Sequence, residues 1–165
     1  MRKTLAIVFI LLLLFTFCLP IYASSTTPVI TPNKDVINSI TYFEDGSYLV
    51  ISTAISTSSN YAKSGSYVKQ SYKTAKYHSS DNELVWEYTL TGTFTVNPGV
   101  SAVCTNVTNS KNIYSNKWSF SDESTYASGN TAYGKGIFKK KLLLVTTEKV
   151  NIDMTITCDF NGNIS

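Results

Sequence analysis

A stretch near the C-terminus alternates strictly between apolar and polar side chains. Its apolar members are Val150, Ile152, Met154, Ile156 and Cys158, and a polar residue stands between each pair. A β-strand places these two sets on opposite faces, whereas a helix would scatter them around its circumference. The stretch therefore predicts a strand with one buried face, and we expect it to be the central strand of a β-protein.

The N-terminus has the layout of a secretory signal peptide. Arg2 and Lys3 precede an uncharged, mostly apolar run of 15 residues from Leu5 to Leu19, and Ala23 stands at a cleavage position. The run is shorter than the roughly 20 residues of a membrane-spanning helix, although an uncleaved anchor is the alternative. We predict a signal peptide at 1–23, a flexible N-terminal leader at 24–34 and a β-sandwich-like domain at 35–165. The mature protein is then secreted or associated with the cell surface, with no stable membrane span.

The charge of the predicted mature chain is close to neutral. Removal of Arg2 and Lys3 turns the 14 basic and 11 acidic residues into 12 and 11, a net charge of +1. This balance argues against a dedicated nucleic-acid binder, whose affinity depends on neutralising phosphates. We therefore predict no nucleic-acid partner.

Cleavage also leaves two cysteines, Cys104 and Cys158, in the mature chain. An even pair in an exported protein predicts a disulfide, which would stabilise the fold by roughly 4 kcal/mol on the chain-entropy model. Two buried free thiols are the alternative. The wide spacing supports neither a redox-active pair nor a zinc site.

Strand patterns separated by turn residues recur along the rest of the chain. A strong example runs from Leu84 to Val96, while residues 121–130 are polar and predict no strand. The stretch from Tyr67 to Tyr77 carries Lys69 and Lys73 and little apolar weight, which favours an edge position. About eight strands and no convincing helix predict an all-β fold, a single antiparallel β-sandwich-like domain with one disulfide. The expected core comprises Leu84, Trp86, Leu90, Phe94, Trp118, Phe120, Ile152, Met154 and Ile156.

Catalytic and metal-binding motifs find little support. His78, the single histidine, adjoins Ser79, Ser80 and Asp81, but a triad needs side chains that converge from separate elements. We interpret His78 as a solvated turn residue. Asp159, Asn161 and Asn163 have the first spacings of a calcium loop without its remainder, which favours a simple turn. We predict no catalytic residue, no metal and no cofactor.

Two surface features are candidates for binding. Exposed tyrosines on a sheet can stack on sugars or peptides, or pair across strands to stabilise the sheet; the candidates are Tyr67, Tyr77, Tyr114 and Tyr133. A lysine run followed by leucines is the second feature: Lys139, Lys140, Lys141, Leu142, Leu143 and Leu144. It is either a tip that binds a membrane or a partner, or a lysine-bearing strand that enters the core. Of the two, we favour the core strand, because leucines are usually buried.

Several short motifs are spread over nearly all of the predicted mature chain. They are Glu44-Asp45-Gly46-Ser47-Tyr48, Lys63-Ser64-Gly65-Ser66, Leu84-Val85-Trp86, Thr89-Leu90-Thr91-Gly92-Thr93-Phe94, Cys104-Thr105, Ile113-Tyr114, Trp118-Ser119, Ser128-Gly129-Asn130-Thr131-Ala132, Thr155-Ile156-Thr157-Cys158 and Asn161-Gly162-Asn163. In these motifs the chain resembles a family of short secreted proteins of Clostridia-type Firmicutes that has no assigned function. The resemblance implies an exported, disulfide-bonded β-domain and carries over no active-site residue.

These observations favour a binding protein over an enzyme. We expect a non-enzymatic secreted or cell-envelope-associated β-domain whose partner is a cell-surface glycan or protein. One alternative is a carboxylate-based hydrolase or lyase acting on extracellular polysaccharides. Another is a secreted toxin or antibacterial factor that acts at membranes.

Overall fold

The computed structural model describes residues 35–56, 65–143 and 145–165, and these form an all-β fold. The predicted signal peptide and leader lie outside this part of the chain. The strands are β1 (Val36–Tyr42), β2 (Tyr48–Ser56), β3 (Tyr67–His78), β4 (Leu84–Asn97), β5 (Ser101–Ile113), β6 (Trp118–Ser128), β7 (Thr131–Leu142) and β8 (Val145–Thr157). The prediction of an all-β fold with about eight strands is therefore confirmed.

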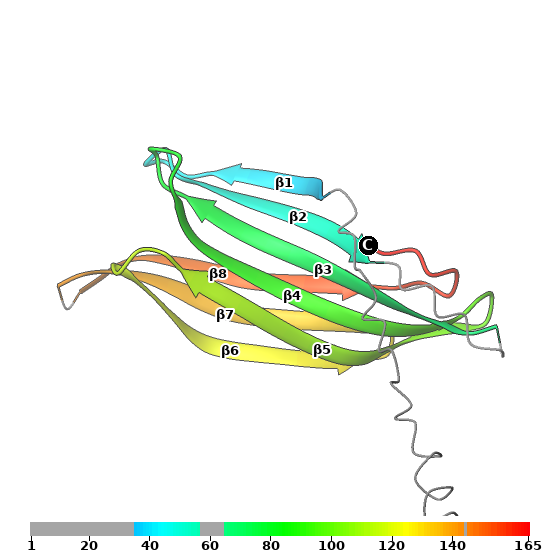
Figure 1. The fold of residues 1–165 in the computed structure, drawn as a ribbon. Helices are drawn as coiled ribbons and strands as arrows, with labels where there is room; N and C mark the ends of the chain where they lie inside the picture. The colour runs from blue at the N-terminus through cyan, green and yellow to red at the C-terminus, as the bar shows by residue number, and fades with distance from the viewer. Residues whose placement is uncertain (1–34, 57–64, 144) are drawn as a thin grey trace, which may run out of the picture.

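The strands form two antiparallel sheets in which every neighbour is also the next strand along the chain. One sheet has the order β1-β2-β3-β4-β5 and the other has the order β6-β7-β8 (Figure 1). Because successive strands reverse direction, the β1–β2, β3–β4, β5–β6 and β7–β8 connections all lie at the same end of the molecule, which we call the odd-turn end.

The hydrophobic core joins the facing sides of the two sheets. Trp86 of β4 stacks on Phe138 of β7 with ring centroids 3.8 Å apart, and Tyr88 of β4 contacts Phe120 of β6 at 5.7 Å. Of the nine predicted core residues, seven are buried; Phe120 packs against the core and Leu84 is half-buried. The β3–β4 pairing is irregular there: Tyr77 pairs with Trp86 and His78 pairs with Leu84, so Val85 is an extra residue in β4.

The positions of two strands in their sheets differ from prediction. The C-terminal strand β8 is the edge of the three-stranded sheet rather than a central strand, and β3 is central rather than an edge. The lysines of β3 suit a central strand because the stem of Lys73 crosses the inner face and its Nζ donates to the Thr155 carbonyl, 3.0 Å away.

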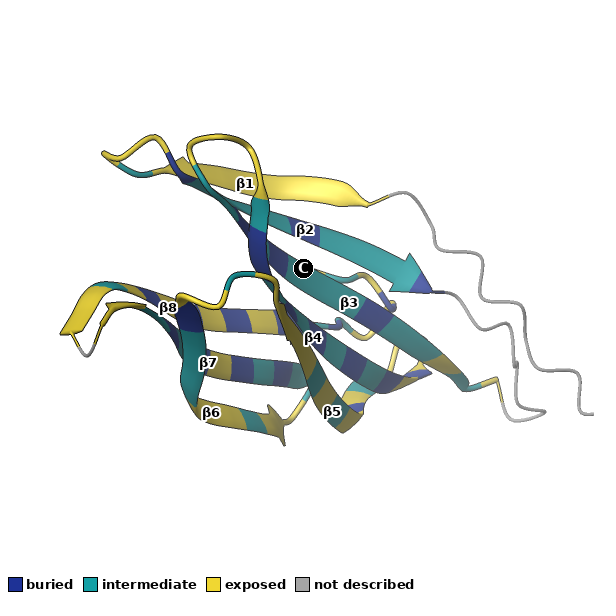
Figure 2. Cartoon of the chain, turned by 60° about the vertical axis from the view of Figure 1, so that its left-hand side comes forward, coloured by how far each residue is buried: buried dark blue, intermediate teal, exposed yellow. Residues whose placement is uncertain are grey.

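Polar segments also proved to be strands. β6 runs through residues 118–128, so the prediction that 121–130 contains no strand is wrong for most of its length. Backbone pairing with β7 holds this segment extended, although most of its side chains are exposed. At the other edge, β1 is exposed over its whole length (Figure 2).

The predicted disulfide is absent, and Cys104 and Cys158 are both buried free thiols. Each Sγ lies 3.6 Å from a nearby backbone carbonyl oxygen, that of Asn106 for Cys104 and that of Asp159 for Cys158. Burial raises the pKa of both thiols, which keeps them protonated at neutral pH. The structure thus agrees with the alternative prediction, that of two buried free thiols.

Candidate functional site

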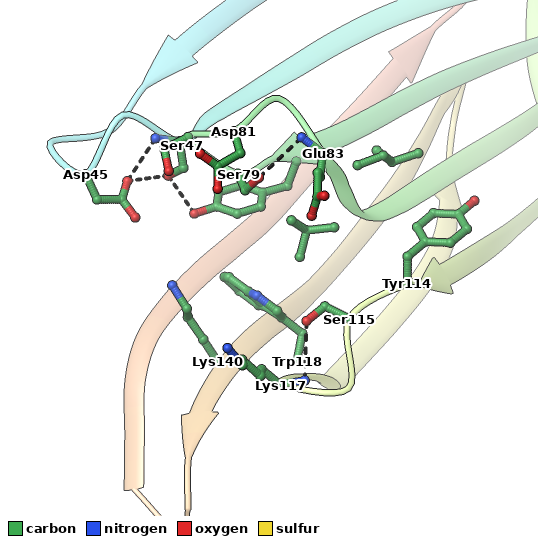
Figure 3. A pocket seen from close by; sticks show the side chains of 14 residues that line it. Asp45, Ser47, Ser79, Asp81, Glu83, Tyr114, Ser115, Lys117, Trp118 and Lys140 are labelled. Atoms are coloured by element: carbon green, nitrogen blue, oxygen red, sulfur yellow. Dashed lines mark hydrogen bonds between the residues drawn. The ribbon is translucent and has the colours of Figure 1, made fainter.

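A pocket of about 300 Å³ opens at the odd-turn end, and we call it the end pocket. Four segments distant in sequence contribute to it: the β1–β2 turn, the end of β3 with the β3–β4 turn and the start of β4, the β5–β6 connection with the start of β6, and the end of β7 (Figure 3). Its lining residues are Asp45, Ser47, Tyr77, Ser79, Ser80, Asp81, Glu83, Leu84, Val85, Tyr114, Ser115, Lys117, Trp118 and Lys140.

Local hydrogen bonds fix the two turns on one side of the end pocket. In the β1–β2 turn, the Ser47 amide donates to Asp45 Oδ1 at 3.0 Å, and Gly46 takes the positive φ of 83° that the turn requires. In the β3–β4 turn, the Ser79 amide donates to the Glu83 carbonyl at 2.9 Å and the Glu83 amide donates to Ser79 Oγ at 3.2 Å. The turn sequences therefore shape the pocket wall directly.

The β5–β6 connection forms the opposite wall. The Tyr114 amide donates to the Val85 carbonyl of β4 at 2.9 Å, and the Lys117 carbonyl accepts from the Lys141 amide of β7 at 2.8 Å. These two bonds tie the connection to both sheets. They place Tyr114, Lys117 and Trp118 across the pocket from the turn carboxylates (Figure 3).

The floor of the end pocket is aromatic and firmly packed. Tyr77 is only 2% exposed, and its ring centroid lies 5.1 Å from that of Trp118 and 5.2 Å from that of Trp86. The Tyr77 hydroxyl donates to Glu148 Oε1 at 2.6 Å and lies 2.7 Å from Ser47 Oγ. Burial beside these rings leaves the floor little freedom to move.

A polar chain continues from Tyr77 to charges in both sheets. Ser47 Oγ donates to Asp45, and Lys140 Nζ donates to Glu148 Oε2 at 3.1 Å. The bonds from the Ser47 side chain and amide lower the pKa of Asp45, so this carboxylate is ionised at neutral pH. Burial, and then the hydrogen bond to Glu148, raise the pKa of Tyr77 well above its usual value, so the phenol stays protonated.

The end pocket offers hydrogen-bonding groups of both kinds to a polar ligand. The lining contains carboxylates in the two turns and the ammonium groups of Lys117 and Lys140 opposite them, so it offers both acceptors and donors. A phenol that stays protonated is a poor general base at neutral pH. Within residues 35–56, 65–143 and 145–165, no group of three or more metal-ligating side chains converges on a metal-sized site.

The four predicted surface tyrosines have four different environments. Tyr114 is 56% exposed at the pocket rim, whereas Tyr77 is 2% exposed and belongs to the pocket floor rather than to an open sheet surface. Tyr133 of β7 stacks on Tyr126 of β6 with ring centroids 4.7 Å apart. Tyr133 therefore pairs across strands, which was the alternative to ligand binding for these tyrosines. Tyr67 packs against the core at the far end of β3. The structure thus brings two of the four to the end pocket.

The lysine–leucine segment forms the end of the β7–β8 hairpin. Leu142 and Leu143 are 64% and 92% exposed, and Val145 is 65% exposed; Leu144 lies outside the described residues. The interpretation that these leucines enter the core is therefore wrong for Leu142 and Leu143. The lysines separate: Lys139 pairs with Asp122 and Lys140 with Glu148, while Lys141 is exposed.

The histidine and the C-terminal turn have structural surroundings. His78 stacks on Tyr48 with ring centroids 4.8 Å apart at the end of β3. Asp159 accepts hydrogen bonds from the amides of Asn161 and Asn163, both at 2.8 Å, which closes the C-terminal turn. These bonds occupy the carboxylate that a calcium loop would need.

Sequence reasoning missed most of the end pocket, including Asp45, Ser47, Glu83 and Lys117, and also Glu148, which bonds Tyr77 in its floor. Their residue types are ordinary in turns and strands. In a chain of consecutive antiparallel strands, alternate turns lie at the same end of the sheet, so the turns that form the pocket could have been grouped once the strand order was known.

No protein-family model matches this chain, and comparison with curated proteins and with solved structures gives no match either. Among the described residues, no helix has the length and apolar character needed to cross a membrane.

Proposed function

We propose that this protein is a secreted, non-enzymatic binding domain of the β-sandwich class that holds a saccharide unit in the end pocket. The observation that carries the proposal is a pocket with charged groups of both signs around a rigid aromatic floor, at one open end of the two sheets. Its volume of about 300 Å³ is at the small end of the usual range for ligand sites.

The chemistry of the rim favours a hydroxyl-rich ligand. The carboxylates of Asp81 and Glu83 accept hydrogen bonds from hydroxyl groups, and the ammonium groups of Lys117 and Lys140 donate to ring and hydroxyl oxygens. The exposed ring of Tyr114 offers an apolar face to the C–H side of a sugar. Its hydroxyl donates to Glu87 Oε1 at 3.0 Å, which holds the ring in place before a ligand arrives.

Binding of purified protein to an array of glycans and cell-wall fragments tests this proposal. We expect Tyr114→Ala and Glu83→Gln each to weaken binding about tenfold, because each removes a contact at the pocket rim. Tyr126→Ala is the matched control, since Tyr126 is also an exposed tyrosine but lies on β6, outside the pocket lining. Equal weakening by Tyr126→Ala, or silence across the array, would count against the end pocket.

A turnover readout in the same experiment separates binding from catalysis. Release of new reducing ends that disappears with Glu83→Gln or Asp81→Asn would replace our proposal with a carboxylate-based hydrolase. Unchanged glycans after prolonged incubation with a ligand that binds would support a binding domain.

Oxidation of the two cysteines after export is a further part of the proposal. The Cys104 amide donates to the Gly129 carbonyl at 2.9 Å and the Cys158 amide donates to the Asn130 carbonyl at 3.0 Å, so both residues flank the same β6–β7 turn. An oxidising compartment would favour a disulfide between the two sheets here. Mass measurement of exported protein without reductant should show a mass lower by two hydrogens; two free thiols would contradict it.

A further inference from the structure

The end of the β7–β8 hairpin exposes apolar side chains to an unusual degree. Leu142 and Val145 face each other as the last pair of the ladder, and Leu143 follows in the turn. All three are more than 60% exposed, and in Figure 1 the hairpin projects beyond the other connections at the odd-turn end. We call Leu142, Leu143 and Val145 the apolar tip.

The apolar tip is not explained by the folding of the chain itself. Leu143 has a φ of +57°, a left-handed conformation that glycine or asparagine adopts more readily than leucine. Its side chain is 92% exposed, so it gains no burial in return for this conformation. An apolar environment outside the molecule would supply the missing contacts.

Positive charge surrounds the base of the apolar tip. Lys141 adjoins it, Lys139 and Lys149 face each other across β7 and β8, and the Lys117 carbonyl is bonded to the Lys141 amide. Together with Lys140, the group carries five positive charges. The neighbouring carboxylates, Asp122 and Glu148, offset two of them. Glu44 and Asp45 of the β1–β2 turn line a hollow with Lys140 and Glu148 and offset two more, so the base of the hairpin keeps a net charge of about +1.

We propose that the apolar tip inserts into the surface of an anionic lipid bilayer, with the surrounding lysines at the level of the headgroups. Apolar insertion combined with basic residues provides the two signals that reversible membrane attachment requires. A second copy of the chain is a poorer occupant, because two such hairpins would bring like charges together. A convex tip suits a deformable lipid surface better than it suits a flat protein surface.

This arrangement would orient the end pocket toward the bilayer, because both lie at the odd-turn end. Membrane binding by the apolar tip does not require the proposed saccharide ligand. Glu83→Gln should weaken glycan binding and leave vesicle binding unchanged, so the two proposals can fail separately.

Co-sedimentation of the full protein with vesicles tests the proposal. We expect binding to phosphatidylcholine vesicles that contain 30% phosphatidylglycerol, in about 0.1 M salt, and much weaker binding to pure phosphatidylcholine or in about 0.5 M salt. Leu143→Asn suits the left-handed turn and should weaken binding about tenfold, as expected when one leucine no longer reaches the apolar phase. Lys141→Gln should weaken it about fivefold.

Two matched controls separate insertion from general stickiness. Val100→Ser removes a 72% exposed apolar residue from the β4–β5 turn at the opposite end, and Lys135→Gln removes an exposed lysine farther along β7. Neither should alter vesicle binding. Tryptophan placed at the tip by Leu143→Trp should shift its emission to the blue and be quenched by brominated lipid, whereas Val100→Trp should show neither effect.

Three results would overturn the proposal. The first is no sedimentation with anionic vesicles by a protein whose β-sheet circular dichroism is intact. The second is binding that Leu143→Asn leaves unchanged. The third is a dimer in sedimentation velocity that Leu143→Asn converts to a monomer without any vesicle binding, which would assign the apolar tip to a second copy.

Discussion

Two buried tyrosines with different hydroxyl environments allow a sharp test of the core beneath the end pocket. Tyr77 and Tyr88 are 2% and 0% exposed, and both lie on the inner face of the five-stranded sheet. The Tyr77 hydroxyl donates to the Glu148 carboxylate at 2.6 Å. The Tyr88 hydroxyl has no well-formed hydrogen bond. Replacing each by phenylalanine removes the same atom from opposite situations.

The expected stability changes have opposite signs. Tyr77→Phe removes a hydrogen bond to a charged group and should lower the free energy of unfolding by about 2 kcal/mol. Tyr88→Phe removes a buried hydroxyl whose loss of hydration is not compensated, and it should raise the free energy of unfolding by about 1 kcal/mol. The cavity left by removing one oxygen atom is too small to change the direction of either stability effect.

Urea unfolding at pH 7, followed by tryptophan fluorescence, measures both variants. The midpoints should move in opposite directions while the slope stays constant, because the surface exposed on unfolding hardly changes. A stable Tyr77→Phe variant, within about 0.5 kcal/mol of the parent, would refute the role of the Glu148 bond. A Tyr88→Phe variant that loses more than about 1 kcal/mol would show that its hydroxyl has a partner.

The alkaline limb of the stability curve extends the same test. Burial raises the pKa of Tyr88 to about 12, with the charge of Glu123 as a second cause. A tyrosine in the unfolded chain ionises near pH 10. Between pH 10 and about 12 the unfolded chain therefore loses this proton while the folded protein keeps it, and the free energy of unfolding falls as the pH rises. The parent should lose about 1 kcal/mol per pH unit in this window through Tyr88. Tyr88→Phe should abolish that part of the decline.

The remaining predictions concern packing, acid and a surface ion pair. Gly136→Ala should destabilise the protein by about 2 kcal/mol in thermal unfolding, because an added Cβ would lie 2.2 Å from the Phe120 ring; unchanged stability would mean that this ring moves freely. Hydrogen bonds within the β1–β2 turn lower the pKa of Asp45, so its stabilising effect is present above about pH 4 and declines as the pH falls further. Asp45→Asn should flatten acid unfolding in that range, and an unaltered acid midpoint would contradict it. Lys111→Ala should change stability by less than about 1 kcal/mol, since its pair with Glu123 is exposed; a larger loss in urea unfolding would show tighter coupling.

Local patterns predicted the strands and their buried faces well. The alternation from Val150 to Ile156 and that from Trp86 to Val96 both correspond to buried faces in the structure. The side-chain period of a strand is a property of the backbone alone, so these assignments need no knowledge of partners. In the structure, Gly134 of β7 lies close to β4, since an added Cβ would lie 2.7 Å from Leu90 Cδ1.

The order of strands and the end pocket came only from the tertiary structure. Lysines made β3 look like an edge, and apolar residues made β8 look central, yet their positions are reversed because pairing depends on partners far along the chain. The same long-range pairing assembles Asp45, Glu83, Lys117 and Lys140 into one pocket and leaves Leu143 exposed. By itself, the sequence determined which faces avoid water. Which strands cover those faces, and which turns meet at one end, was decided by the packing of the two sheets.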